Sequence, residues 1–173
     1  MIFWSMKSNK NEPFETIYRQ HHAMVLHMCL GFVKGDKDTA NDLSQEIFIS
    51  VWNNLDKFRG ASSYKTWIYR ITVNTCLQYV KKDKKEKTVP TLDVENKAAT
   101  IETETNTNQN VSELYKAIGQ LKKIDRLIIM MVLENQDYDK ISEVIGIRHT
   151  NVRVKIYRIK KRLATILKNN KNE

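Results

Sequence analysis

The chain has 173 residues, of which 41% are hydrophobic, so it can form one ordinary domain or two small ones with cores of modest size. Its 29 basic and 20 acidic residues give a net charge of +9, which favours an anionic partner such as nucleic acid, an acidic protein or an anionic membrane surface. The first ten residues hold too few apolar side chains for a signal peptide and no later run approaches a membrane span, so we expect a cytoplasmic protein without stable membrane insertion.

Helices are expected nearly throughout the chain. Gly occurs five times and Pro twice, and apolar residues recur mostly at steps of three and four, which predicts an all-α fold. The first half should contain helices from about Pro13 to Val33, Asp38 to Asn54 and Tyr64 to Lys82. Its cysteines, Cys29 and Cys76, sit among apolar residues without a CxxC spacing, so we expect buried free thiols rather than a disulfide.

The second predicted helix has a solvated face of unusual composition. Ala40, Leu43 and Ile47 begin the stripe that should be buried. The opposite side carries acids and amides around an apolar residue: Asp42, Gln45, Glu46, Ile49 and Asn53. One exposed Ile is ordinary, but an acidic setting for it on a basic protein suits docking to a basic protein surface rather than to DNA.

The third predicted helix and the loop before it suggest binding of single-stranded DNA. The helix face opposite the core carries Trp67, Arg70 and Asn74, and an aromatic ring among cations and amides can stack on an unpaired base. The preceding loop consists of small residues that let backbone approach a base, or simply connects two helices. For Trp67 the equally good alternative is a half-buried ring that caps the core.

A polar segment separates the two halves of the chain. Residues 83–111 are rich in Thr and Asn and almost free of large apolar side chains, which predicts a flexible linker between a domain at 1–82 and another at 112–173. The net charges of the three parts are +4, −2 and +7 in chain order. Two basic helical domains on an acidic tether are therefore expected.

The pattern of the C-terminal part predicts a helix-turn-helix. Helices are expected near 116–122, 125–135, 138–145 and 149–168, and Gly146 lies at the turn before the last one. The last helix should bury Val152, Ile156 and Ile159. Its other faces present Thr150, Arg153, Val154, Tyr157, Arg158 and Lys161.

A helix after such a turn enters the major groove of DNA and reads base edges with its N-terminal residues. Arg153 and Arg158 can each donate two hydrogen bonds to a guanine, and Val154 can touch a thymine methyl group. A solvated, lysine-rich terminal helix is the alternative for the charge run alone, but the preceding helix and turn favour DNA. A membrane-surface helix is less compatible, since the apolar stripe is needed by a core.

Two stretches resemble one known family. DLSQEIFISVWNNLDKFRGASSYKTWIYRITVNTCLQYVKK is similar to the second region of bacterial sigma factors, and LKKIDRLIIMMVLENQDYDKISEVIGIRHTNVRVKIYRIKKRL to the fourth. The linker stands where the third region would be, which is the layout of the extracytoplasmic-function group. The resemblance implies two small helical domains and the function of a promoter-specificity subunit.

The resemblance also implies a role for each surface. The acidic helix face would bind core RNA polymerase through Asp42, Gln45, Glu46, Ile49 and Asn53. The loop and third helix would capture the melted −10 promoter element through Gly60, Ala61, Ser62, Ser63, Tyr64, Trp67, Arg70 and Asn74. The last helix would read the −35 element through Asn151, Arg153, Val154, Tyr157, Arg158 and Lys161. An anti-sigma factor that covers these faces is a further implied partner.

Two departures from the family pattern concern the promoter sequence rather than the fold. Gln78 stands where the family often has an acid. Arg148, His149 and Thr150 replace the small or polar residues that usually open the recognition helix.

Two other functions are alternatives to promoter recognition with polymerase. One is a helix-turn-helix regulator with an unrelated N-terminal sensor, which would bind DNA as a dimer without polymerase. The other is a zinc enzyme using His21, His22, His27 and Cys29, but His22 and His27 are five residues apart and share no helical face. The chain has no P-loop and no Gly-rich phosphate motif, so we expect neither an enzyme nor a cofactor or metal site.

Overall fold

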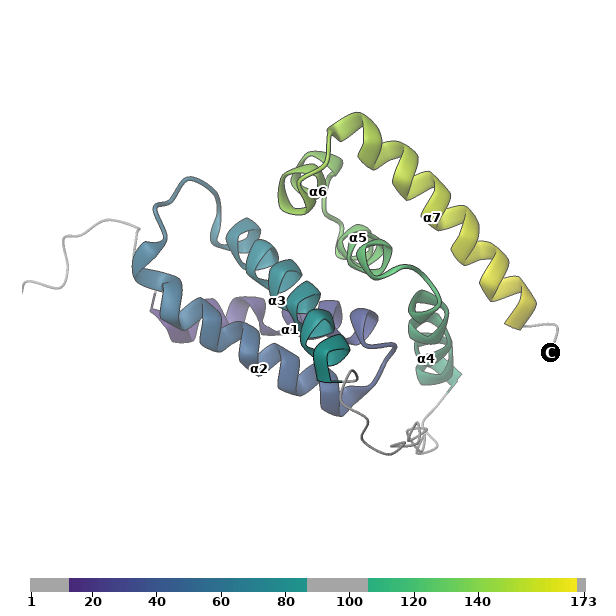
Figure 1. Ribbon diagram of the computed structural model, residues 1–173, viewed down its shortest axis with the longest axis horizontal. Coiled ribbons are helices and arrows are strands. Elements are labelled where there is room, and N and C mark those ends of the chain that lie inside the picture. Colours follow the sequence, from purple (N-terminus) through teal and green to yellow (C-terminus); the bar gives the residue numbers. More distant parts are fainter. Residues whose placement is uncertain (1–12, 87–105, 171–173) are drawn as a thin grey trace, which may run out of the picture.

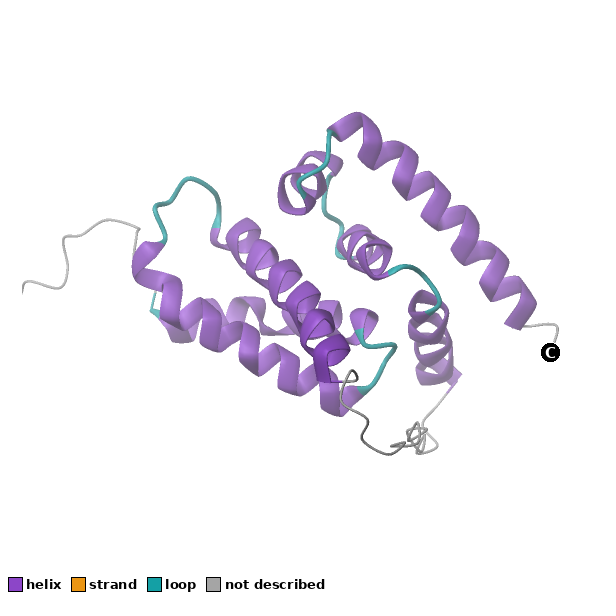
Figure 2. Cartoon of the chain, viewed as in Figure 1, coloured by secondary structure: helices purple, strands orange, loops and turns teal. Residues whose placement is uncertain are grey.

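The computed structural model describes residues 13–86 and 106–170, and all regular structure in these two segments is helical (Figures 1 and 2). This confirms the predicted all-α fold. The elements in chain order are α1 (Phe14–Phe32), α2 (Lys37–Asn54), the 3₁₀ turn η1 (Leu55–Lys57), α3 (Tyr64–Glu86), α4 (Asn106–Gly119), α5 (Lys123–Leu133), α6 (Tyr138–Ile145) and α7 (His149–Asn170).

Helices α1, α2 and α3 pack on one another and form what we call the N-terminal unit. Side-chain caps fix where two of them begin. The carboxylate of Asp36 accepts a hydrogen bond from the Thr39 amide at 3.1 Å at the start of α2. The hydroxyl of Ser63 accepts one from the Thr66 amide at 3.2 Å at the start of α3. Both residues satisfy backbone donors that a helix leaves unpaired in its first turn.

The cysteines of the N-terminal unit are free and fully buried, as the sequence predicts. Cys29 lies on α1 and Cys76 on α3. A hydrogen bond between the two thiols, together with burial, raises the pKa of Cys76 well above its ordinary value. The thiol therefore stays protonated and unreactive, which fits a packing role.

Helices α4 to α7 form the C-terminal unit, in which α7 packs on α4, α5 and α6. Asp137 caps α6 by accepting from the Lys140 amide at 2.8 Å. Gly146 ends α6 with a φ of 76°, a left-handed conformation that glycine adopts without steric cost. The chain then turns directly into α7, which gives the predicted helix-turn-helix.

The predicted limits of the linker differ from the structure at both ends. Helix α3 continues to Glu86, and the helix expected at 116–122 is instead α4, which covers Asn106–Gly119. Residues 83–86 and 106–111 are therefore helical rather than linker. The remaining linker residues, 87–105, lie outside the described residues, so the flexible tether stays a prediction.

The two units touch along one side (Figure 1). Helix α5 packs on α1 and α3, α6 packs on α3, and α4 packs on α1, while α7 lies on the side of the C-terminal unit away from α1–α3. Among the described residues, α2 makes no contact with α4–α7. The buried side chains of both units accordingly form one continuous hydrophobic cluster.

Candidate functional site

The predicted polymerase-binding face lies on the solvated side of α2. All five predicted residues, Asp42, Gln45, Glu46, Ile49 and Asn53, are exposed, and the Ile49 side chain is 61% accessible. The structure adds a second apolar residue, Trp52, one turn further along α2 and equally exposed at 61%. The helical spacing of Ile49 and Trp52 was visible in the sequence, but Trp52 is not among the predicted residues.

An aromatic cluster supports Trp52 from behind. Its ring meets Phe14 of α1 edge to face, with centroids 5.0 Å apart. Phe14 in turn contacts Tyr18 and Phe48 at 6.2 and 6.4 Å. The indole is therefore held in one position on the surface while most of it stays open to a partner.

The predicted −10 residues lie in the α2–α3 connection and along α3. Gly60 has a φ of 70° and is exposed, so the loop turns at a residue that tolerates this conformation. Tyr64 stacks on Phe58 at 4.2 Å, and Trp67 lies 5.1 Å from the same ring. Phe58, two residues before Gly60, is not among the predicted residues, and its contact makes Trp67 a half-buried member of a surface aromatic group.

The polar residues of the −10 face differ in their exposure to solvent. Asn74 is exposed on α3. Arg70 is half-buried, and its guanidinium donates to the carboxylate of Glu143 on α6 at 2.5 Å. A residue expected to meet DNA is thus held by the C-terminal unit.

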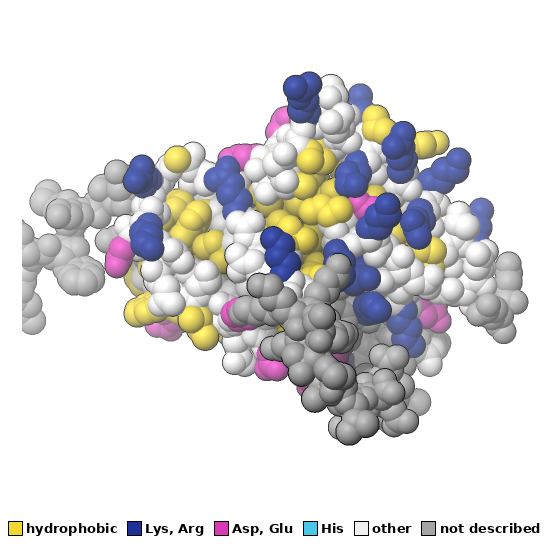
Figure 3. Space-filling view, viewed as in Figure 1, with side chains coloured by type: hydrophobic (Ala, Val, Ile, Leu, Met, Phe, Trp, Pro, Cys, Tyr) yellow, Lys and Arg dark blue, Asp and Glu magenta, His cyan; other side chains and the backbone are white. Residues whose placement is uncertain are grey.

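The predicted −35 residues are all exposed on α7: Asn151, Arg153, Val154, Tyr157, Arg158 and Lys161. Tyr157 is 68% accessible and Val154 48%, so both present apolar surface to solvent among cations. The opposite side of α7 buries Val152, Ile156 and Ile159 as predicted. In Figure 3 the Lys and Arg side chains gather on the half of the molecule that α7 forms.

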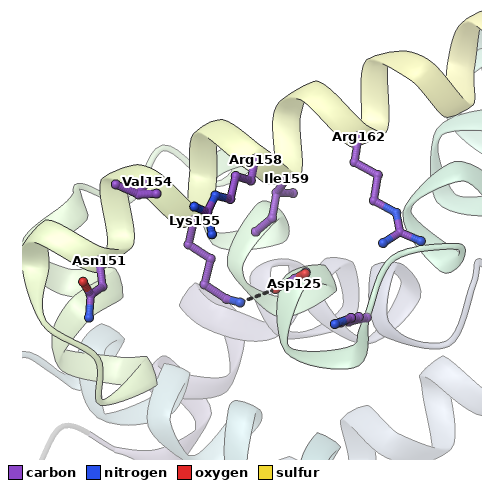
Figure 4. Close-up of a pocket in the computed structure, with 8 residues that line it drawn as sticks. Asp125, Asn151, Val154, Lys155, Arg158, Ile159 and Arg162 are labelled. Carbon is purple, nitrogen blue, oxygen red and sulfur yellow. Dashed lines mark ion pairs between the residues drawn. The ribbon is translucent and has the colours of Figure 1, made fainter.

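A groove of about 510 Å³ lies between α7 and the start of α5 (Figure 4). Its acid, Asp125, is paired with Lys155 at 2.8 Å, which leaves the cations of the other basic residues in excess. Its lining residues are Lys122, Asp125, Asn151, Val154, Lys155, Arg158, Ile159 and Arg162. Lys122, Lys155 and Arg162 were not predicted, although Lys155, Arg158 and Arg162 recur at steps of three and four along α7.

The candidate zinc ligands on α1 have other surroundings. His27 Nδ1 lies 2.9 Å from Glu134 Oε1, His22 packs against Tyr18 and Phe48, and Cys29 is buried beside Cys76. Within residues 13–86 and 106–170, no three His, Cys, Asp or Glu side chains form a group that could hold a metal ion. None of the helices in these segments could cross a membrane.

Family models match both units. Residues 17–86 match the model of sigma-70 region 2, and residues 112–163 match that of sigma-70 region 4. Together they cover most of α1–α3 and of the C-terminal unit, in the order that the sequence resemblance implies.

Curated relatives agree with these models. The chain is 25% identical over 154 residues to the RNA polymerase sigma factor YlaC of Bacillus subtilis, covering 85% of this chain and 87% of that protein. It is 24% identical over 158 residues to the ECF sigma factor SigM of Mycobacterium tuberculosis, covering 89% and 76%.

Two solved structures share the fold. One is the sigma factor RpoE of Bartonella quintana in complex with the anti-sigma factor NepR, with a TM-score of 0.71, 19% identity and coverage of 90% of this chain and 96% of the other. The second is CnrH in complex with the cytosolic domain of CnrY, with a TM-score of 0.67, 16% identity and coverage of 90% and 88%.

Proposed function

Because this chain belongs to the extracytoplasmic-function group of sigma factors, which direct core RNA polymerase to promoters, we propose that three separate surfaces carry out this function. The acidic face of α2 binds core polymerase, the loop before α3 with α3 itself binds the melted −10 element, and α7 reads the −35 element. RNA synthesis is the reaction of the polymerase, so the chain itself is assigned no catalytic role.

The observation that carries this division is the different chemistry of the three faces. The α2 face combines acids with two exposed apolar residues, Ile49 and Trp52, which suits a protein partner. The α7 face combines cations with Val154 and Tyr157, which suits base edges and phosphates. The two lie on different units, so polymerase and the −35 element can be bound at once.

The groove between α7 and α5, which Arg162 lines, is suited to bind a phosphate of the promoter backbone. After Asp125 and Lys155 neutralise each other, Lys122, Arg158 and Arg162 leave an excess of positive charge beside the reading face. Such a site attracts a phosphate without regard to sequence. We assign Arg153 and Arg158 to bases and Arg162 to the backbone.

Membership of the family also suggests a further protein partner and a cellular location. In the matched structures RpoE is bound to the anti-sigma factor NepR, and CnrH is bound to the cytosolic domain of CnrY. We propose that an anti-sigma factor likewise covers the DNA- and polymerase-binding faces of this chain, in the cytoplasm. A helix-turn-helix regulator that acts without polymerase has no support, since both units match sigma regions.

Arginine substitutions on α7 should separate base reading from charge attraction. Arg153→Ala or Arg158→Ala is expected to flatten the preference at one or two base pairs of the −35 element by about 1–3 kcal/mol, the contribution of a bidentate contact to guanine. Arg162→Ala, and Lys161→Ala as a second phosphate candidate, should weaken all sequences alike and lower the salt slope by about one.

The measurement is polymerase-dependent binding to the preferred −35 sequence and its single-base variants across a salt series. Arg158 and Arg162 are one helical turn apart and both line the groove, so Arg162→Ala is the matched control. Equal, sequence-independent losses for all four variants would show that α7 anchors only the backbone.

A further inference from the structure

Arg148, His149 and Thr150 stand where the turn after α6 leads into α7, and the side chains of all three are exposed. The residues proposed to read the −35 element begin just after them, at Asn151. In a helix-turn-helix the last helix meets DNA with its N-terminal residues. His149, the first residue of α7, therefore lies at the edge of the proposed −35 surface.

The imidazole of His149 faces a carboxylate across the turn. Its Nε2 atom lies 3.4 Å from Oδ1 of Asp139, in the first turn of α6. The side chain of Asp139 is 88% accessible and that of His149 is 51% accessible, so an outside partner can reach both groups. The ring of Tyr138, also on α6, lies beside the imidazole with the centroids 6.4 Å apart. The contact with Asp139 is an ion pair only while the imidazole carries a second proton.

Other acids on the helices that pack against α7 are paired or lie away from its start. Asp137 caps the first turn of α6, and Glu143 pairs with an arginine of α3. On α5, Asp125 pairs with a lysine of α7 more than one turn beyond His149. Helix α4 packs on α7 near the C-terminal end of that helix (Figure 1). Asp139 is thus the carboxylate that these helices bring to the imidazole.

The protonation state of the imidazole decides the charge at the start of α7. Duplex DNA carries one negative charge per about 1.7 Å of its axis, so an uncompensated carboxylate at Asp139 opposes its approach. A protonated His149 neutralises this carboxylate through Nε2 and can donate from Nδ1 to a phosphate oxygen. Arg148 then adds a positive charge that no longer serves to balance Asp139.

We propose that His149 is a proton-dependent phosphate contact of the −35 surface, which shields Asp139 and binds the promoter backbone only as the imidazolium. This inference rests on the proposed function, in which α7 binds the −35 element. A histidine changes its charge between about pH 5 and pH 8. Because nearby phosphates favour the charged form, DNA binding is coupled to uptake of a proton, and affinity rises as the pH falls through this range. The base preference stays the same, since a phosphate contact carries no sequence information.

The contact can be measured by fluorescence anisotropy of a labelled duplex of mixed sequence, about 30 base pairs long, titrated with the full chain at low salt. A sequence-independent contact does not require the promoter as the probe. The affinity at pH 6 should exceed that at pH 8 by about fivefold, as expected for one added charged hydrogen bond. The dependence of affinity on salt should be steeper by about one at pH 6.

Substitutions of His149 separate its charge from its shape. His149→Gln should remove the pH dependence and bind the duplex as the starting chain does at pH 8. His149→Lys keeps a cation at both pH values and should bind at both as the starting chain does at pH 6. His27→Gln is the matched control, because the His27 side chain is also 51% accessible and also lies beside a carboxylate, but on α1. It should keep the full pH dependence.

Removal of the carboxylate tests the shielding. Asp139→Asn should tighten binding at pH 8 by about threefold, because a neutral imidazole leaves this charge facing the phosphates. Asp38→Asn makes the same change at an exposed position of α2 and should not differ from the starting chain. Equal affinities for these two variants would overturn the shielding of Asp139.

Equal affinities of the starting chain at pH 6 and pH 8, or a pH dependence that persists in His149→Gln, would overturn the proton-dependent contact. Either result leaves the assignment of α7 to the −35 element intact, since that assignment is tested by base preference in the presence of polymerase. A chain that binds the duplex at neither pH would overturn the contact as well.

Discussion

Arg126→Ala is expected to lower the free energy of unfolding of the chain by about 3 kcal/mol, since one side chain satisfies backbone groups from three places. Its guanidinium donates to the carbonyls of Leu121 at 3.0 Å, Phe32 at 2.8 Å and Gly119 at 2.6 Å. Phe32 ends α1 and Gly119 ends α4, where carbonyls have no partner within the helix. Burial lowers the pKa of Arg126, yet an arginine stays charged, so removal of the side chain leaves three acceptors without a cation.

Urea unfolding followed by circular dichroism measures this loss. Arg126→Lys keeps the charge but lacks the planar fork, so it should recover only part of the stability. Arg19→Ala is the matched control, because Arg19 is 78% exposed and pairs with Glu15 one turn away on α1, a contact worth about 0.5 kcal/mol or less. Equal midpoints for Arg126→Ala and Arg19→Ala would show that Arg126 is not the shared cap of the two helix ends.

Trp52→Ala should raise the dissociation constant for core polymerase by about 30-fold, or about 2 kcal/mol, while the fold stays intact. Trp is enriched among the few residues that contribute most of the binding energy at protein interfaces. Trp52 is 61% accessible, is supported by Phe14 and lies beside Ile49 on the acidic face of α2. Its removal costs little packing, since most of the ring already faces solvent.

The measurement is a titration of labelled chain with purified core polymerase. Val111→Ala on α4 is the control, because Val111 is also an exposed apolar residue, at 45%, but lies outside the proposed face. Ile49→Glu should weaken binding as well, by placing another carboxylate where an apolar contact is proposed. Wild-type affinity for both Trp52→Ala and Ile49→Glu would remove the α2 face from the polymerase interface.

The helices that the sequence predicts best are those with both a strong apolar period and a clear end signal. The predicted range 138–145 matches α6 because Asp137 caps its start and Gly146 ends it. The predicted start of α4, near residue 116, is too late, since Asn106, Thr107 and Asn108 are weak helix formers and fall in the segment predicted as a linker. Helix α5 was expected to reach 135 but stops at Leu133, and Asn135 then adopts a left-handed φ of 56°.

The sequence predicts which site residues are exposed wherever exposure follows from helical spacing. It does not predict contacts between residues that lie far apart in the sequence. The five α2 and six α7 residues are all exposed, as their positions opposite buried stripes require. The ion pair of Arg70 with Glu143 joins the two units. The Met130 side chain of α5, which packs against Gly31 of α1, joins them as well. The run of apolar residues in α5 signals burial on several sides, but a single sequence does not say that α1 covers one of them.

The most direct test of the central claim is transcription in vitro from fragmented genomic DNA, with core polymerase alone and with the chain added. The account predicts new transcripts with defined start sites that appear only when the chain is present and decline when Trp52→Ala or Arg153→Ala replaces it. Identical transcripts with and without the chain at saturating concentration, from a core polymerase that a known sigma factor activates, would contradict the claim that it directs polymerase to promoters.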